Sequence, residues 1–229
     1  MDKKQQIRIK KKWKNSEIRI SKYLRDIIHG YMISDGYIPR NSGCLYVQHS
    51  NKQEKFVLWL YNKMKLIRTS YPIQTKIQIH SKTKKQTTKV CFNTRNILQG
   101  FRYMWYKDEI DEKTNKYSKK LPNSIDGFFN ETFISVWFAG NGTKIINSRG
   151  AKFEVTALSV QDRLKLKFLF LKKFNIKTQI ISSGISSKGT SQWALKIPAS
   201  EYSKFRKLII KEDLIPTLFA YKLHKNIEV

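Results

Sequence analysis

Cysteine and histidine are scarce in this chain of 229 residues, and their scarcity excludes several classes of protein. The only two cysteines, Cys44 and Cys91, form no CxxC pair, so they predict neither a zinc site nor a disulfide framework. Both lie in alternating, strand-like segments, which favours small buried residues. None of the four histidines pairs with another at the helical spacing of metal ligands. We therefore expect no structural metal.

Long apolar runs are also missing. No run approaches the roughly 20 apolar residues that span a bilayer, and no basic amphipathic anchor stands out, so we expect no membrane partner. Residues 1–20 lack the apolar core of a secretory signal. They are basic, but serine and arginine are too few for a good organellar transit peptide. We expect residues 1–20 to be a solvated basic arm that contacts phosphates.

Positive charge is what the chain has in excess. Lys and Arg number 45 against 17 acidic residues, which gives a net charge of +28 and a pI near 10.1. A folded chain so unbalanced repels itself, and a polyanionic partner best explains the excess. Nucleic acid is favoured over a membrane surface. The 40% hydrophobic and 13% aromatic shares predict a folded chain with a sizeable core.

Two short stretches, more than a hundred positions apart, carry most of the functional information. Ile28 to Gly36 reads Ile-His-Gly-Tyr-Met-Ile-Ser-Asp-Gly, and Ile134 to Gly142 reads Ile-Ser-Val-Trp-Phe-Ala-Gly-Asn-Gly. Each is an apolar helical run that stops at an acidic or amide residue followed by Gly, and each continues into a strand-like segment. The two copies differ at one important position, which is Asp35 in the first and Asn141 in the second.

The segments around these stretches repeat one order of elements in two halves, residues 21–106 and 121–229. In the first half we expect helix, two strands, helix, two strands and helix over residues 23–34, 36–40, 44–50, 52–64, 73–80, 89–94 and 96–106. The second half repeats this order over residues 130–140, 142–147, 151–157, 160–174, 177–182, 192–197 and 200–210. Residues 107–120 are highly charged without apolar periodicity, which predicts a linker.

A tandem αββαββα repeat of this kind predicts an α+β protein with an internal pseudo-twofold axis. Two four-stranded antiparallel sheets would then form a nucleic-acid-binding saddle. Alternate residues of a strand face opposite sides of a sheet, so half of them pack on the helices and their neighbours face the groove.

Both nonapeptides resemble the signature of the LAGLIDADG homing endonucleases and their maturase relatives. Three flanking patterns extend the resemblance over residues 23–225, and these are the passage from 45 to 61, the basic segment 119–123 and the C-terminal segment 215–223. The resemblance to single-chain members implies a monomeric, Mg²⁺-dependent endonuclease that cleaves duplex DNA at a long asymmetric site. The alternative is a non-catalytic RNA-binding protein of the same fold, either an intron-splicing maturase or a ribonucleoprotein or organellar ribosome component.

The same resemblance implies a site at the ends of the two motif helices. These helices would pack side by side through the small residues Gly30, Ser135, Ala139 and Gly140. Their ends would deliver Asp35 and Asn141, with Ser34 and Gly140, to a divalent metal at the scissile phosphates. A nearby lysine would stabilise charge on the phosphate, and the resemblance places Lys222 there for one strand and Lys119 or Lys120 for the other.

Contacts with nucleic acid are expected from polar residues that lie mostly on strands. Without a strand register, roughly half of these residues are expected to point away from the groove. The candidates are Arg40, Gln48, Gln74, Lys76, Gln78, Lys84, Lys144, Lys152, Glu154, Gln179, Gln192 and Lys196.

Asn141 departs from the family pattern, because an amide brings no negative charge to a metal site. Three readings stay open: a deliberate change that traps an uncleaved complex, a naturally degenerate half-site that nicks or only binds, or recruitment to an RNA role. The chain is also rich in Lys, Ile and Asn, a bias common in A+T-rich organelle genomes. We accordingly expect a mitochondrial or chloroplast protein.

Overall fold

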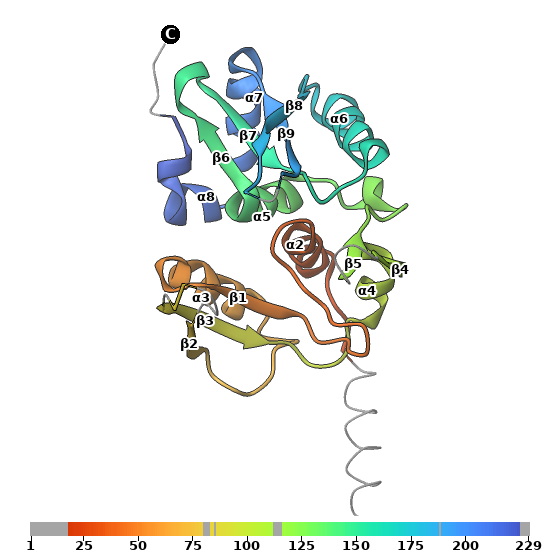
Figure 1. Cartoon of the computed structure of the whole chain (residues 1–229), viewed down its shortest axis with the longest axis vertical. Helices are drawn as coiled ribbons and strands as arrows, with labels where there is room; N and C mark the ends of the chain where they lie inside the picture. The colour runs from red at the N-terminus through yellow and green to blue at the C-terminus, as the bar shows by residue number, and fades with distance from the viewer. Residues whose placement is uncertain (1–17, 80–82, 85, 112–115, 188, 225–229) are drawn as a thin grey trace, which may run out of the picture. The chain divides into compact units, whose positions relative to one another are not determined.

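A computed structural model describes residues 18–79, 83–84, 86–111, 116–187 and 189–224. The chain divides into two compact units, and each is described by itself. Unit 1 comprises the described part of Met1–Arg25 together with Gly36–Arg102, and unit 2 comprises Asp26–Asp35 with the described part of Tyr103–Val229. The first motif helix, α2 (Lys22–Ile33), therefore belongs mostly to unit 2 (Figure 1).

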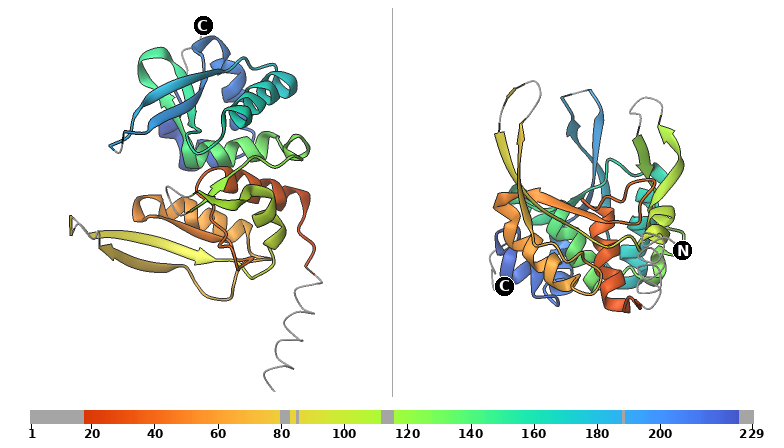
Figure 2. Two further views of the ribbon diagram at one scale, coloured as in Figure 1. Left: turned by 45° about the vertical axis from the view of Figure 1, so that its right-hand side comes forward. Right: turned by 90° about the horizontal axis from the view of Figure 1, so that it is seen from below.

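Unit 1 is a three-stranded antiparallel sheet with one covering helix. The strand order is β1-β3-β2, with bounds β1 (Tyr46–Ser50), β2 (Gln74–Ile79) and β3 (Gln86–Asn93). The 3₁₀ turn η1 (Asn51–Gln53) leads into α3 (Glu54–Lys63), which buries Phe56, Val57 and Leu60. α4 (Gln99–Trp105) follows the sheet. β2 and β3 project as a hairpin beyond α3 (Figure 2).

The sheet of unit 1 has three strands where the sequence predicts four. Residues 36–40 make a single bridge, between Tyr37 and Tyr46, and do not form a strand. Pro39 has no N–H to donate to a ladder, and its carbonyl accepts instead from the Ser42 amide in a turn. The segment therefore leaves the sheet after one pair.

Unit 2 contains the predicted four-stranded antiparallel sheet, in the order β6-β7-β9-β8. Its core is aromatic, since Phe153 of β7 contacts the rings of Trp137, Phe170 and Phe205, which come from three different helices. The strands are β6 (Gly142–Ile145), β7 (Gly150–Glu154), β8 (Gln179–Ile185) and β9 (Ser191–Ile197). The helices are α5 (Glu131–Asn141), α6 (Val160–Phe174), α7 (Ala199–Ile209) and α8 (Leu214–Leu218), with 3₁₀ turns η2 (Ile125–Gly127), η3 (Ile146–Ser148) and η4 (Ala220–Lys222).

The segment predicted as a linker contains a hairpin, which its sequence pattern does not indicate. β4 (Tyr106–Asp111) pairs antiparallel with β5 (Lys116–Lys119), beginning at the pair Tyr106 and Lys119. Backbone hydrogen bonds form this ladder, so it needs no apolar alternation in the sequence. The predicted α+β architecture with antiparallel sheets is confirmed. Among the described residues, none of the helices has the length and hydropathy of a membrane span.

Candidate functional site

The two motif helices, α2 and α5, lie side by side in unit 2, and two glycines permit their close approach (Figure 1). A Cβ on Gly30 would lie 2.5 Å from the Phe133 carbonyl oxygen and 2.9 Å from the Val136 Cβ. A Cβ on Gly140 would lie 2.6 Å from the Ser34 Oγ and 2.9 Å from the Asp35 Oδ2. At the other end of the pair, Asn130 caps α5 and donates to the Asp26 carboxylate at 2.7 Å. The helices are thus held together at both ends.

Ser135 is not part of this contact, which corrects the expectation from the sequence. Its hydroxyl donates to the Ile209 carbonyl of α7 at 3.1 Å. Positions 133, 136 and 140 share the face of α5 toward α2, and position 135 lies well away from it at 100° per residue. Ala139 is fully buried, and its carbonyl accepts a hydrogen bond from Lys222.

Asp35 and Asn141 lie at the ends of these two helices. α2 ends at Ile33, where the Ser34 hydroxyl donates back to the Tyr31 carbonyl at 3.0 Å. Asp35 follows with an exposed side chain, and its carboxylate lies beside Gly140 at the end of α5. Asn141 is the last residue of α5, partly exposed, and the edge strand β6 starts directly after it. The structure therefore brings the two signature ends into one place.

Each motif helix is capped at its C-terminal end by a lysine from a distant segment. The Lys119 ammonium donates to the carbonyls of Met32 (2.7 Å) and Ser34 (2.8 Å). The Lys222 ammonium donates to the carbonyls of Phe138 (3.1 Å), Ala139 (2.7 Å) and Gly140 (3.4 Å). A cation is favourable there because the last carbonyls of a helix have no partner within the helix and carry its negative dipole end.

These contacts distinguish between the lysines that the sequence predicts. Of the two alternatives Lys119 and Lys120, it is Lys119 whose ammonium reaches α2, while the Lys120 backbone amide donates to the Trp105 carbonyl. Lys144 corrects the expectation, since it lies on the helix-facing side of its sheet and its ammonium donates to the Leu223 carbonyl at 3.2 Å.

Burial lowers the pKa of Lys119 to about 8, and the Asp35 carboxylate acts in the opposite direction. The same two causes, burial first, lower the pKa of Lys222 to about 8. Both ammonium groups therefore interact electrostatically with Asp35, and both titrate close to neutral pH. The two lysines and Asp35 form one electrostatically coupled cluster.

The free energy of unfolding is expected to rise with pH between about pH 8 and 10.5 because of Lys222. Its pKa falls from 10.5 in the unfolded chain to about 8 in the folded protein, so the unfolded chain binds more protons in this window. Between pH 8 and 10.5, the free energy of unfolding of the wild type should rise by up to roughly 3 kcal/mol more than that of Lys222→Met. Urea unfolding at several pH values measures this, with Lys207→Met on exposed α7 surface as the control. Parallel curves for wild type and Lys222→Met would contradict the assignment.

The oxygen donors here suit one hard cation better than two. Asp35 supplies a carboxylate, and Ser34 and Gly140 supply carbonyls that also accept from the lysines. Asn141 adds only an uncharged amide oxygen. The described residues contain no cluster of three or more His, Cys, Asp or Glu side chains. Asp35 is thus the one carboxylate of the cluster that could hold a divalent ion, and Asn141 does not supply the second negative charge that a second ion would require.

The register of the unit 1 sheet places all four of its predicted strand residues on one face. Gln48 and Gln74 flank Cys91 in one row across the sheet, and Ser50, Lys89 and Lys76 form the next row. Gln78 lies opposite Thr87 on the same side. The opposite face carries the buried residues Val47, Val90 and Phe92. Lys89 is missing from the prediction, although alternation with Val90 and Phe92 would have placed it outward.

The unit 2 sheet carries a similar polar row. Thr143, Lys152, Lys196 and Gln179 lie directly opposite one another across the four strands. Glu154 and Gln192 alternate onto the same face, and the buried Ala151, Phe153, Leu195 and Ile197 take the other face. Two predicted contacts lie outside strands: Arg40 is exposed after residues 36–39, and Lys84 is exposed in a left-handed turn (φ 52°) between β2 and β3.

The three-stranded and the four-stranded sheet therefore each contain a directly opposed pair of lysines, Lys76 with Lys89 and Lys152 with Lys196. Like charges opposite each other destabilise a sheet. A polyanion lying on the face would remove this repulsion, because each ammonium could contact a phosphate. The two pairs identify these faces as candidate nucleic-acid surfaces.

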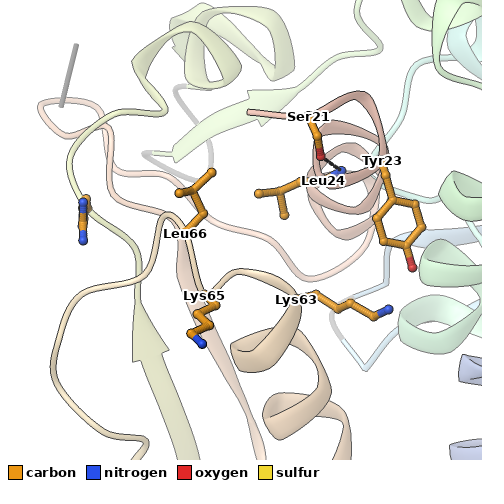
Figure 3. Close-up of a pocket in the computed structure, with 7 residues that line it drawn as sticks. Ser21, Tyr23, Leu24, Lys63, Lys65 and Leu66 are labelled. Atoms are coloured by element: carbon orange, nitrogen blue, oxygen red, sulfur yellow. Dashed lines mark hydrogen bonds between the residues drawn. The ribbon is translucent and has the colours of Figure 1, made fainter. Parts of the chain in front are cut away.

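Unit 1 also has a basic pocket on its helical side, which no sequence pattern indicates. It has a volume of about 560 Å³ and is lined by Ser21, Tyr23, Leu24, Lys63, Lys65, Leu66 and Arg95 (Figure 3). The Lys63 ammonium lies 5.1 Å from the ring centroid of Tyr23 and 5.3 Å from that of Trp59. Among the described residues, no carboxylate pairs with Lys63, Lys65 or Arg95. The pocket adds a second cationic surface to the unit.

Comparison with known proteins identifies one family and two similar structures. The sequence profile of the LAGLIDADG DNA endonuclease family matches residues 25–205. The homing endonuclease I-WcaI, bound to its DNA recognition sequence, is similar over 95% of this chain and 92% of its own, with a TM-score of 0.77 and 16% identity. The match to full-length DUF199/WhiA from Thermatoga maritima spans 93% of this chain and 66% of that protein's chain, with a TM-score of 0.48 and 12% identity. No curated protein sequence matches the chain.

Proposed function

Because this chain belongs to the LAGLIDADG DNA endonuclease family, we propose that it binds duplex DNA at a long asymmetric site and retains one functional half of a cleavage centre. The opposed lysine pairs Lys76–Lys89 and Lys152–Lys196 are the observation that carries the binding proposal. A single chain with two different halves reads an asymmetric sequence, whereas an identical pair of subunits would favour a palindrome.

Cleavage is proposed to depend on Asp35. Its carboxylate and the Ser34 carbonyl would hold a divalent ion, Mg²⁺ in this proposal, which when bound supplies a Lewis acid and lowers the pKa of water. Lys119 and Lys222 hold the two helix ends in place and set positive charge beside Asp35. Their ammonium groups would attract the scissile phosphate and stabilise the charge that builds on it.

Asn141 is proposed to impair the other half of the centre. Its amide contributes no charge at the end of α5, so attack on the second DNA strand lacks the support that Asp35 provides. The chain would then nick its target or bind it without cutting. An organellar location is part of the same proposal, supported by the Lys-, Ile- and Asn-rich composition.

A non-catalytic role on RNA is the second candidate function. The observation that favours it is the basic pocket around Lys63, Lys65 and Arg95, which lies on the helical side of unit 1 and not on the sheet face. An intron-splicing or ribonucleoprotein component contacts RNA phosphates from several directions and needs such surfaces. Loss of RNA affinity in Lys63→Gln/Lys65→Gln, with duplex DNA affinity unchanged, is the result that would favour this role.

The binding proposal predicts opposite effects on stability and on DNA affinity. In Lys76→Gln/Lys89→Gln, the slope of log K against log salt for duplex DNA should become less steep by about 1.8, because two phosphate contacts are lost. The free energy of unfolding should rise by roughly 0.2–1 kcal/mol, since the repulsion between the strands is gone. Fluorescence anisotropy over a salt series and urea unfolding measure the two effects.

Lys52→Gln/Lys55→Gln is the matched control, because it removes the same charge from exposed positions at and just before the start of α3 in the same unit. An equal change of slope in both double variants would mean that the sheet face has no special part in binding. The affinity for DNA would then be explained by the net charge of the protein.

A further inference from the structure

α6 has two apolar faces, and the sheet and its neighbours cover only one of them. Leu166, Leu169 and Phe170 are buried. On the outward side, Val160, Leu164, Phe168 and Leu171 are 60%, 52%, 59% and 46% exposed. These four residues, spaced i, i+4, i+8 and i+11, form one stripe along the helix, here called the α6 stripe. α6 lies at the margin of unit 2 beside β8 (Figure 1).

The α6 stripe reverses the usual pattern of a surface helix. A helix at the margin of a globular unit normally buries its apolar stripe and presents polar residues to water. Single exposed apolar residues are common and need no explanation, but a continuous stripe of four marks a surface that is covered by something. Ser159 caps the start of α6, and Asn175 ends it in a left-handed conformation, so the helix is well formed without the partner.

Charge around the stripe selects among the possible occupants. α6 carries five cationic residues against the single acidic Asp162. Lys167 is exposed beside the stripe and makes no ion pair among the described residues. The Lys172 ammonium lies 5.9 Å from the Phe168 ring centroid and pairs with the Asp126 carboxylate at 2.9 Å. A second copy with a net charge of +28 would be repelled. Residues 1–17 are equally unsuitable, because they contain seven cationic and two acidic residues.

We propose that the α6 stripe docks an acidic amphipathic helix of a partner protein. Its span of eleven residue steps is about 16 Å, which matches three turns of a partner helix. Anchors at such spacings are how one helix binds the apolar face of another element. A carboxylate flanking the partner's apolar face would contact Lys167. This interaction is independent of the nucleic-acid surfaces on the sheets.

Two synthetic peptides and the full chain test the proposal. Each peptide has about 20 residues of Glu, Ala and Leu, long enough to form a helix. One places its leucines on a single helical face, and the other has the same composition in shuffled order. At physiological salt, fluorescence anisotropy is expected to show at least tenfold tighter binding of the first peptide to the wild type. Leu164→Ser/Phe168→Ser, which changes no charge, should abolish that difference.

Ile146→Ser/Ile185→Ser is the control, because it replaces two exposed apolar residues elsewhere in unit 2 (78% and 73% exposed) and should keep the difference. Equal binding of both peptides to the wild type overturns the proposal, as does a difference that survives in Leu164→Ser/Phe168→Ser. Sedimentation of the wild type alone should show a monomer. A dimer that Leu164→Ser/Phe168→Ser dissociates would overturn the acidic partner in favour of a second copy.

Discussion

Asn141→Asp is expected to turn a protein that nicks or only binds its target into one that cuts both strands. The new carboxylate would stand at the end of α5, next to Gly140 and the Lys222 ammonium, and would supply the missing negative charge for a divalent ion. A duplex selected from a random library by the wild-type protein and cloned in a supercoiled plasmid serves as substrate. Formation of linear plasmid in Mg²⁺ should accelerate at least a hundredfold.

Two control variants accompany this experiment. Thr143→Asp adds the same charge two residues later, on the exposed face of β6, and should produce no linear plasmid. Asp35→Asn should lower any remaining nicking about a thousandfold, since a bound metal contributes several kcal/mol to phosphate chemistry. DNA affinity in EDTA should not fall in Asp35→Asn, because the change removes a negative charge. If Asn141→Asp yields no linear product, the impaired-enzyme reading is wrong and the RNA role becomes the better proposal.

Gly30→Ala is expected to lower the free energy of unfolding by about 2–3 kcal/mol. The added methyl would lie 2.5 Å from the Phe133 carbonyl oxygen, and backbone atoms cannot move aside as a flexible side chain can. Forcing an extra methyl into a close-packed contact typically costs 1–3 kcal/mol. Because α2 and α5 would have to separate, cleavage by Asn141→Asp should also disappear when the two changes are combined.

Gly100→Ala provides a matched control for this substitution. Gly100 also lies in a helix, but a Cβ there would meet nothing within 4 Å. Alanine should therefore stabilise that helix by roughly 0.5–1 kcal/mol through its better helix propensity. Chemical unfolding of both variants measures the contrast, and a Gly30→Ala protein as stable as the wild type would show that the helices do not pack through this glycine.

Some features of the site could be predicted from local sequence alone. The two motif helices and the strand after the second of them follow from apolar runs that end at an acidic or amide residue and Gly. That Asp35 and Asn141 meet was implied by the family resemblance. Gln48, Gln74, Lys76 and Gln78 share one face because they alternate with apolar neighbours, and the same rule would have found Lys89. The missing fourth strand of unit 1 was also foreseeable, since Pro39 cannot donate to a ladder.

Other features depend on contacts between residues far apart in the chain. No local pattern separates Lys119 from Lys120, and only the pairing of β4 with β5 brings the Lys119 ammonium to the end of α2. Ser135 is small enough to pack against either neighbouring helix, and only the position of α7 decides that its hydroxyl donates to the Ile209 carbonyl. The pKa of Lys222 is lowered because its ammonium is buried against carbonyls of α5 that lie 82 to 84 residues away in sequence.

The sequence by itself determined the family, the order of elements, the excess of positive charge and the replacement of one acid by Asn141. These features depend on residue types and on short-range periodicity, and each segment has both independently of the others. Only the tertiary structure decided which lysines cap the motif helices, which lysines oppose each other in the sheets and which face of α6 remains uncovered. Such facts depend on which surfaces meet, and burial and register are properties of pairs of segments that no single segment contains.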